Sequence, residues 1–299
     1  MSSLKSTINE TYNKCKLREY LKKEMGLSTR LIRRASLDKR IFLNGAPVKM
    51  NIIVNTGDIV NIDLATKETQ NIVPEKMDID IVYEDEDILI VNKEPFMVVH
   101  PTKSYQSGTL ANGVLNYFID SNQNCIVRLV SRLDMNTSGL IIIAKNQYAH
   151  GMLSKTMEKN EIVKKYIAIV HGHMENESGV IDLPIYNPKD DLGLRRIVDE
   201  RGKRSITHYK VLERLNDADV VECRLETGRT HQIRVHLSHL GHPIYGDTLY
   251  GYGGDEMDLI KRQALHAYFL EFKSPRTQKL LEVKADLPSD MKLLIEKLR

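Results

Sequence analysis

The residues best suited to chemistry lie in one stretch, RLVSRLDMNTSGLIIIAK, at positions 128–145. It carries a carboxylate, Asp134, with guanidinium groups close by in the sequence at Arg128 and Arg132. A carboxylate that is held in place can act as a base or as a nucleophile. A plainer interpretation stays open, in which Asp134 and Thr137 only cap a turn, because such turns are frequent.

Two elements must hold this carboxylate. Residues 140–143 are four branched apolar residues, too few for a helix, and they predict a buried strand. Residues 134–139 are polar or glycine and predict a turn just before that strand. A polar turn fixed to a core strand is a common way to present catalytic groups.

Composition describes an ordinary globular chain. Of its 299 residues 41% are hydrophobic and 28% are charged, and no run approaches the roughly 18 apolar residues of a membrane span. The first residues lack the apolar segment of a signal peptide, and the three cysteines show no disulfide or metal-binding spacing. We expect a cytoplasmic, monomeric protein that has no membrane partner.

The charge is unevenly distributed. Residues 14–49 hold eleven Lys or Arg and three acidic residues, a net charge of +8, and since the whole chain carries +3 the remainder carries −5. A basic module joined to a mildly acidic body is typical of a protein that binds nucleic acid.

This basic module predicts two short helices and a small sheet. Residues 16–25 are expected to form an amphipathic helix, and Ser28 the N-cap of a second helix from 29 to about 38. Residues 41–45 predict a strand that enters an Asn-Gly hairpin turn. The stretch LREYLKKEMGLSTRLIRRASLDKRIFLNGAPV resembles the RNA-binding motif first described in the small-subunit ribosomal protein S-four; the plainer alternative is a solvated basic helix. The expected RNA contacts are Arg30, Arg33, Arg34 and Lys39.

The rest of the chain is rich in strands. The fold class we expect is α+β, with a mixed, largely antiparallel sheet in a domain at 78–299, preceded by a linker at 65–77 and a small α/β RNA-binding domain at 1–64. The pattern predicts a hairpin at 79–94 with a solvated acidic turn, a short strand at 98–101, helices at 110–118 and 289–298, and strands at 164–172, 206–215, 219–226 and 264–272.

Several segments of this second part carry a specific resemblance. SRLDMNTSGLIIIAK resembles the central motif of the RluA-type pseudouridine synthases, HRLDxxTSGLLLxAK, and NKEPFMVVHP resembles the family's NKPxGxVVHP segment. KKYIAIVHG, RIVDERGKRSITHY, LETGRTHQIRVHLSHLGHPIYGDTLYG and RQALHAYFLEF are similar to its later motifs, in the family's order. The chain departs from the pattern at Ser131, where His is usual, and at Glu94, Phe96 and Met97.

The resemblance implies an isomerase that breaks the N-glycosidic bond of a uridine in structured RNA and re-forms a bond to C5 of the same base. By this resemblance Asp134 attacks C1′ of the sugar or takes a proton from C2′. Arg234 pairs with Asp134, and Arg229 lies nearby in the same motif, on what we expect to be one helix. Tyr166 is the family's tyrosine, which stacks on the base, for which the plainer alternative is a packed core residue.

The resemblance also implies substrate contacts. Arg132 enters the gap left by the flipped base, and Ile233 forms an apolar wall of the uracil pocket. Thr137 is grouped with these substrate-binding residues. The reaction needs no cofactor and no metal, although the several histidines near 236–242 leave a metal-dependent nuclease as an alternative. A second alternative is a non-catalytic RNA-binding or ribosome-assembly factor, and both ribosomal RNA, which we favour, and transfer RNA are possible substrates.

Overall fold

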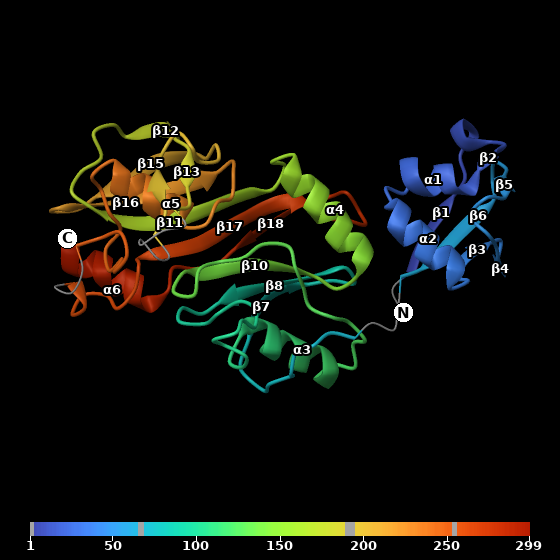
Figure 1. Cartoon of the computed structure of the whole chain (residues 1–299), viewed down its shortest axis with the longest axis horizontal. Helices are drawn as coiled ribbons and strands as arrows, with labels where there is room; N and C mark the ends of the chain where they lie inside the picture. The colour runs from blue at the N-terminus through green and yellow to red at the C-terminus, as the bar shows by residue number, and fades with distance from the viewer. Residues whose placement is uncertain (1–2, 65–68, 189–194, 253–255) are drawn as a thin grey trace.

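The structure is a computed structural model that describes residues 3–64, 69–188, 195–252 and 256–299. Its elements form a small N-terminal module and a larger body built on one long sheet (Figure 1). Residues 65–68 of the expected linker lie outside the described residues. In the described ranges no helix has both the length and the apolar character needed to cross a bilayer.

The N-terminal module packs two helices on a small antiparallel sheet. Helix α1 (Leu17–Lys23) is followed by Gly26 with φ +67°, and α2 (Thr29–Leu37) starts at Ser28, whose side chain accepts a hydrogen bond from Leu31 N at 3.1 Å. Both helices and this cap are as the sequence predicts. The sheet order is β1-β6-β3-β4. The strands are β1 (Ser3–Thr7), β2 (Cys15–Lys16), β3 (Ile41–Leu43), β4 (Ala46–Pro47), β5 (Ile53–Val54) and β6 (Ile59–Asp63), with a 3₁₀ turn η1 (Glu10–Tyr12) after β1.

The body contains a ten-stranded sheet in the order β12-β15-β16-β11-β17-β10-β8-β7, with β18 beside β17 and β9 beside β10. Every neighbouring pair is antiparallel except β10 and β17. This mixed, largely antiparallel sheet confirms the expected fold class. The strands are β7 (Asp80–Glu84), β8 (Ile88–Lys93), β9 (Arg128–Leu129), β10 (Ser138–Ala144), β11 (Val163–His171), β12 (Ser178–Asp182), β15 (Ile206–Arg214), β16 (Ala218–Leu225), β17 (Leu265–Lys273) and β18 (Leu280–Lys284).

The helices of the body cover both faces of this sheet. They are α3 (Leu110–Asp120), α4 (Gln147–Glu158), α5 (Gln232–His239) and α6 (Ser289–Leu298), and a separate pair of short strands, β13 (Ile185–Tyr186) and β14 (Ile197–Val198), lies beside α5. Because successive residues of a strand point to opposite faces, Ile141 and Ile143 of β10 pack with α3, and Leu140 and Ile142 pack with α4. All seven residues of β10 are therefore buried.

Two sequence expectations about the start of the body are wrong. Residues 98–101 form no strand; instead the carbonyl groups of Val98 and Val99 accept the N–H groups of Leu110 and Ala111, which begin α3. The acidic turn after β7 is only partly solvated, since Asp87 is buried and forms an ion pair with Arg276 at 2.9 Å. Helix α4 was not predicted.

The N-terminal module contacts the body through α4. Tyr148 of α4 belongs to the buried core of the module, and Lys155 Nζ donates to Gly26 O at 3.2 Å. Arg276, after β17, donates to Ser3 O at 2.5 Å. Residues 69–77 have no helix or strand, but Val73 O accepts a hydrogen bond from Asn112 of α3 at 2.7 Å, so this segment is held on the body.

Candidate active site

Asp134 lies on the turn that leads into β10, as the sequence predicts. Thr137 N donates to Asp134 O at 3.1 Å and closes the turn, and β10 begins at Ser138. Gly139 has φ +115°, and a Cβ atom there would collide with the backbone of Ala267. Glycine at position 139 therefore allows β17 to pair in parallel with β10 at the residues that follow the turn carrying Asp134.

Hydrogen bonds from two buried basic side chains, those of Lys93 and Arg262, hold the backbone of this turn. Lys93, at the end of β8, donates through Nζ to Met135 O at 2.9 Å and also to Glu94 O and Met97 O. Arg262 donates to Asn136 O at 3.2 Å. Burial and the positive charge of Arg262 lower the pKa of Lys93 to about 7, although Asp134 and Glu94 favour its charged form. The backbone of the turn is thus anchored independently of the carboxylate it carries.

Arg262 also ties the turn to the last helix. Its Nε and Nη2 donate to the carboxylate of Asp290 in α6 at 2.7 and 2.9 Å. The neighbouring residue Gln263 donates to Thr137 Oγ1 at 3.1 Å. The side chain of Thr137 is buried, and its hydrogen bond with Gln263 supports the turn.

Arg234 connects Asp134 to a second carboxylate. Its Nη1 donates to Asp134 Oδ2 at 3.0 Å, while its Nε and Nη2 donate to Asp247 at 2.7 and 2.8 Å. Burial disfavours the charge of Arg234, but the bonds to Asp247 and the charge of Asp134 outweigh it and raise the pKa. The pair of Arg234 and Asp134 that the resemblance implies is therefore present in the fold.

Helix α5 explains why Arg234 reaches the site. Ile233 and Leu237 of this helix are buried with Val221 and Ala264 in the core beneath it. The helix begins at Gln232, whose Oε1 accepts the N–H of Arg229 at 3.0 Å. Arg229 therefore precedes the helix, contrary to our expectation, and its Nε donates to Arg204 O at 3.3 Å rather than to Asp134.

Tyr166 lies on β11 and belongs to the same buried core as Ile233 of α5. Its side chain is buried, and burial followed by the negative charge of Asp134 raises its pKa. The phenol is therefore protonated near neutral pH.

The other expected residues have different surroundings. Arg132 is exposed, and among the described residues it has no hydrogen bond or ion pair. Ile233 is buried in the core of the body. Arg128 donates to Ile126 O and Lys145 O and does not approach Asp134 through these bonds. Arg30, Arg33, Arg34 and Lys39 are all exposed on or just after α2.

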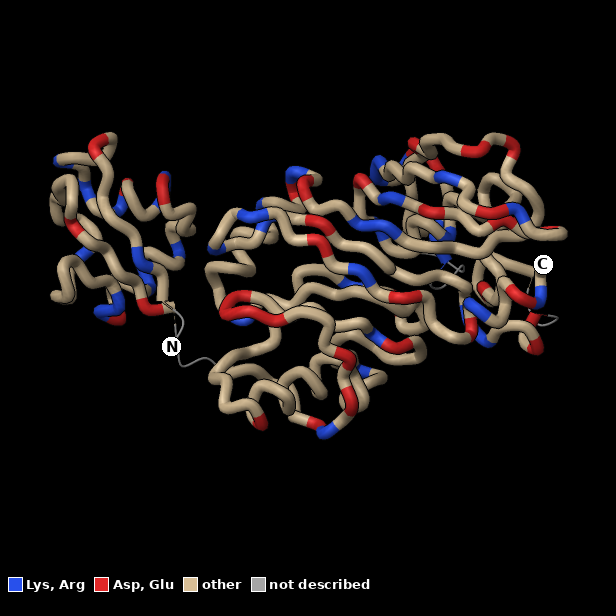
Figure 2. Tube along the Cα trace, turned by 180° about the vertical axis from the view of Figure 1, so that it is seen from behind, with Lys and Arg blue, Asp and Glu red and all other residues tan. Residues whose placement is uncertain are grey.

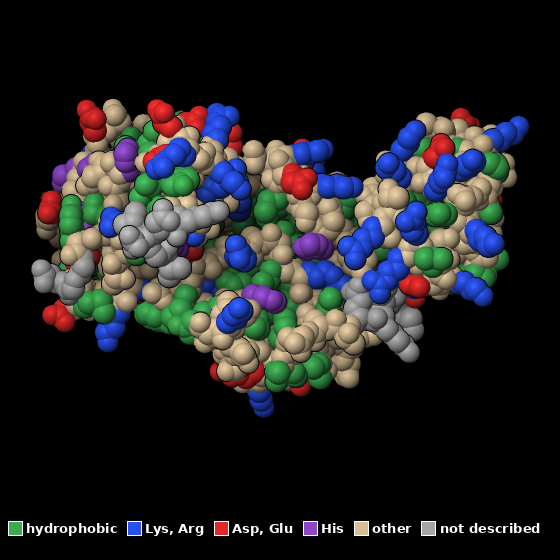
Figure 3. Space-filling model, viewed as in Figure 1, with side chains coloured by type: hydrophobic (Ala, Val, Ile, Leu, Met, Phe, Trp, Pro, Cys, Tyr) green, Lys and Arg blue, Asp and Glu red, His purple; other side chains and the backbone are tan. Residues whose placement is uncertain are grey.

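Lys and Arg side chains continue from the module onto the body. Figure 3 shows them over the N-terminal module and across the middle of the larger body on the same face, and Figure 2 shows their positions along the chain from behind. A broad positive face of this kind is the electrostatic footprint expected for a polyanion.

The histidines that left a metal site open have other partners. His236 bonds to Thr207 Oγ1 and Leu183 O, and His242 bonds to His171 O. Among the residues that the structure describes, no three His, Cys, Asp or Glu side chains are grouped as metal ligands.

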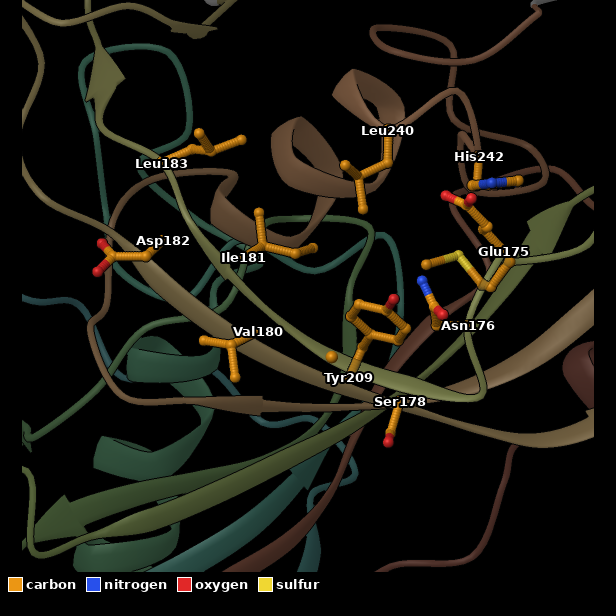
Figure 4. Close-up of a pocket in the computed structure, with 12 residues that line it drawn as sticks. Glu175, Asn176, Ser178, Val180, Ile181, Asp182, Leu183, Tyr209, Leu240 and His242 are labelled. Atoms are coloured by element: carbon orange, nitrogen blue, oxygen red, sulfur yellow. The ribbon is translucent and has the colours of Figure 1, made fainter.

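A separate hollow of about 600 Å³ lies between β12 and the end of α5 (Figure 4). Ile181, Tyr209, Leu240 and His242 are among the residues that line it. Of the residues considered from the sequence only His242, one of the histidines of the alternative metal site, lines it, and Asp134 and Arg234 do not.

The sequence interpretation missed the residues that support this site. Lys93, Asp247 and Arg262 all lie inside motifs that were recognised, but a motif does not tell which partner a side chain will meet. The sequence signal that was available is a charged residue at the end of an apolar strand, as Lys93 is after ILIVN. Such a charge is either exposed or satisfied by specific partners.

The chain is similar to known proteins over most of its length. The family model described as RNA pseudouridylate synthase matches residues 87–239. An uncharacterized RNA pseudouridine synthase of Bacillus subtilis, YlyB, is 43% identical over 88% of this chain and 86% of its own length. The ribosomal large subunit pseudouridine synthase D of Buchnera aphidicola is 40% identical over 73% of each chain. The solved structure of human RNA pseudouridylate synthase domain containing 1 is 29% identical, with a TM-score of 0.59 over 70% of this chain and 83% of that one.

Proposed function

This chain belongs to the RNA pseudouridylate synthase family and is an isomerase of RNA uridines; from that premise we propose which of its residues perform the reaction and which RNA it modifies. The observation that carries the assignment of residues is the 3.0 Å hydrogen bond from Arg234 to Asp134. This bond connects Arg234 to Asp134, the acid of the Arg-Leu-Asp triplet, although the two residues are 100 positions apart in the sequence.

Asp134 is the group that acts on the ribose. In the reaction the bond from N1 of the uracil to C1′ breaks, the base turns, and C5 forms a bond to C1′, after which C5 loses its proton and N1 carries one. An ionised carboxylate can attack C1′ or remove the proton from C2′. Arg234 holds this carboxylate in place by donating to Oδ2 at 3.0 Å. Among the described residues, the hydrogen bonds and ion pairs of the side chain all reach Oδ2, which leaves Oδ1 for the nucleotide.

Tyr166 and three other residues hold the nucleotide. Extruding a uridine from structured RNA costs a few kcal/mol, and an aromatic ring that stacks on the base returns about 1–3 kcal/mol. Tyr166 supplies that ring, Arg132 is exposed and can enter the gap left in the RNA, and Ile233 contributes the apolar wall. Arg229, which is exposed and lies just before α5, contacts a phosphate of the RNA.

The substrate is ribosomal RNA. Support comes from relatives named ribosomal large subunit pseudouridine synthase D, which are 36 to 40% identical to this chain, and from the basic N-terminal module, which suits a large structured RNA. This module, at residues 1–64, acts as an S-four-like RNA-binding domain that contacts RNA through Arg30, Arg33, Arg34 and Lys39, and residues 78–299 form the catalytic domain. The chain acts as a monomer and in the cytoplasm, and the second of these agrees with its three free cysteines.

The test is a map of pseudouridines in ribosomal and transfer RNA from cells that have or lack the protein. We expect at least one ribosomal position to lose the modification and to regain it with the wild-type chain. Asp134→Asn, which keeps the size of the side chain, should fail to restore it. Asp120→Asn, at the exposed end of α3, is the matched control and should restore it. Loss of modification only in transfer RNA would refute the ribosomal assignment, and rescue by Asp134→Asn would refute the catalytic one.

A further inference from the structure

A histidine that the reaction does not yet account for faces Asp134. His231 Nε2 lies 3.8 Å from Asp134 Oδ2, the oxygen that already accepts Nη1 of Arg234. This separation exceeds hydrogen-bond length by less than 1 Å, and catalytic hydrogen bonds are often long before the substrate binds. The His231 side chain is mostly enclosed, with 13% of its surface exposed.

The backbone holds the imidazole at this position. His231 has φ +58° and ψ +18°, a left-handed conformation that is uncommon outside glycine, asparagine and aspartate. Its carbonyl oxygen accepts Val235 N at 2.9 Å and so forms part of the first turn of α5. The ring therefore lies with Nε2 near Asp134 at some cost in backbone strain.

Tyr250 determines which ring nitrogen carries the proton. The Tyr250 hydroxyl accepts the N–H of Arg196 at 2.7 Å and lies 2.9 Å from His231 Nδ1. No other acceptor for this buried hydroxyl is found among the described residues, so its own proton must go to Nδ1. Nδ1 is then the acceptor, and in the neutral ring the proton sits on Nε2, the atom that faces Asp134. Burial keeps His231 neutral by lowering its pKa, although Asp134 acts in the opposite direction.

We propose that His231 is a positioning residue: its Nε2–H, with Nη1 of Arg234, holds Asp134 Oδ2 so that Oδ1 is presented to the ribose. Tyr250 selects the tautomer that makes this possible. The inference rests on the proposed role of Asp134 and deepens it, because it names the second donor to the same oxygen.

Two substitutions at His231 separate this role from a structural one. The side-chain amide of Gln can place an N–H near the position of Nε2, whereas the shorter Asn side chain reaches only the position of Nδ1. Asn tolerates the left-handed backbone better than Gln does. A positioning role therefore predicts that His231→Gln is the more active variant, and a purely structural role predicts the reverse order.

The experiment measures single-turnover release of tritium from ribosomal RNA labelled at C5 of uridine and taken from cells that lack the protein. We expect the rate at saturating enzyme to fall about 10- to 100-fold in His231→Asn, the loss of a hydrogen bond to a charged group, and to stay within about threefold in His231→Gln. RNA affinity should be unchanged in both. Tyr250→Phe should slow the wild type more than it slows His231→Gln, since Gln has no tautomer to select.

The outcomes are distinguishable. An Asn variant as fast as the Gln variant, or equal effects of Tyr250→Phe in both backgrounds, would overturn the inference. If His231→Asn fails to fold, the Tyr250→Phe comparison decides alone. A wild-type chain that releases no tritium, or an Asp134→Asn variant that still does, would overturn the proposed function instead.

Discussion

Asp247 binds Arg234 through two hydrogen bonds, at 2.7 and 2.8 Å, and leaves Nη1 of the guanidinium to reach Asp134. Asp247 is itself fixed by the N–H groups of Leu249 and Tyr250. A planar guanidinium can bridge two carboxylates in this way because its donors point in fixed directions. The geometry of the pair of Arg234 and Asp134 is thus set by a third residue, Asp247.

The first prediction concerns this bridge. Arg234→Lys keeps the positive charge, but one ammonium group cannot satisfy Asp247 twice and also hold Asp134 in place. We expect the rate of pseudouridine formation to fall about 100-fold or more, which is the cost of a misplaced catalytic group. Single-turnover kinetics measure this rate. Arg299→Lys, whose partner Glu213 is exposed, is the matched control and should behave as the wild type does.

The second prediction concerns pH. His266 of β17 is buried beside Ser138, and burial together with the charge of Arg262 lowers its pKa to about 4. Between about pH 6.5 and pH 4 the unfolded chain therefore binds a proton that the folded chain does not, so the free energy of unfolding decreases as the pH falls through this window.

His266→Gln removes this titration. We expect the free energy of unfolding of the variant, relative to that of the wild type, to rise by up to about 3 kcal/mol as the pH is lowered from 7 to 4. Urea unfolding of both proteins measures this difference. His239→Gln, at an exposed position of α5, should show no such shift relative to the wild type. A pH-independent difference for His266→Gln would contradict the prediction.

The third prediction concerns a turn that departs from the family pattern. Phe96 stands where that pattern has glycine, yet its φ is +62° and its side chain is 53% exposed. The turn therefore keeps the left-handed conformation and bears the strain of a Cβ atom there. We expect Phe96→Gly to raise the free energy of unfolding by about 0.5–1 kcal/mol, the strain relieved minus the flexibility that glycine adds to the unfolded chain.

Phe96→Ala is the control for this experiment, because it removes the ring but keeps the Cβ atom. Thermal unfolding should show no gain for alanine. Equal gains for alanine and glycine would mean that the exposed ring, and not the backbone, is the source of the instability.

The fourth prediction concerns RNA binding by α2. The guanidinium groups of Arg30 and Arg33 are exposed on this helix. Replacing both by Gln should lower the slope of log affinity against log salt by about 1–2, because each phosphate contact contributes roughly 0.7–0.9. The matched control replaces Lys292 and Lys297 of α6 by Gln. A slope that changes equally in both double variants would show that the effect is one of total charge.

Local signals were enough to predict the elements on which the site rests. The four branched residues at 140–143 predict β10, Ser28 predicts the start of α2, and both residues of the Asn44-Gly45 turn have the positive φ that an Asn-Gly hairpin requires. The last helix begins and ends where the sequence places it, at Ser289–Leu298. In each case the determining residues are neighbours in the chain.

Features set by distant partners could not be predicted. The sequence predicted a solvated turn at Asp87. Its partner Arg276 is 189 positions away, and nothing near Asp87 in the chain indicates that partner. Residues 98–101 have strand-like composition, but the carbonyl groups of Val98 and Val99 accept hydrogen bonds from the start of α3. The apolar spacing of α4 is weakened by polar residues, and one of its faces is covered by the N-terminal module, which only the fold brings there.

The link from Asn136 through Arg262 to Asp290 has a consequence for biosynthesis. Arg262 follows Asn136 by 126 positions, and Asp290 follows Arg262 by 28. While the ribosome has translated the chain only as far as β16, the acid of the Arg-Leu-Asp triplet and Lys93 are already made, but Arg262 and Asp290 do not yet exist. We expect a nascent polypeptide of that length to be unable to modify RNA until the segment containing Asp290 has emerged and docked.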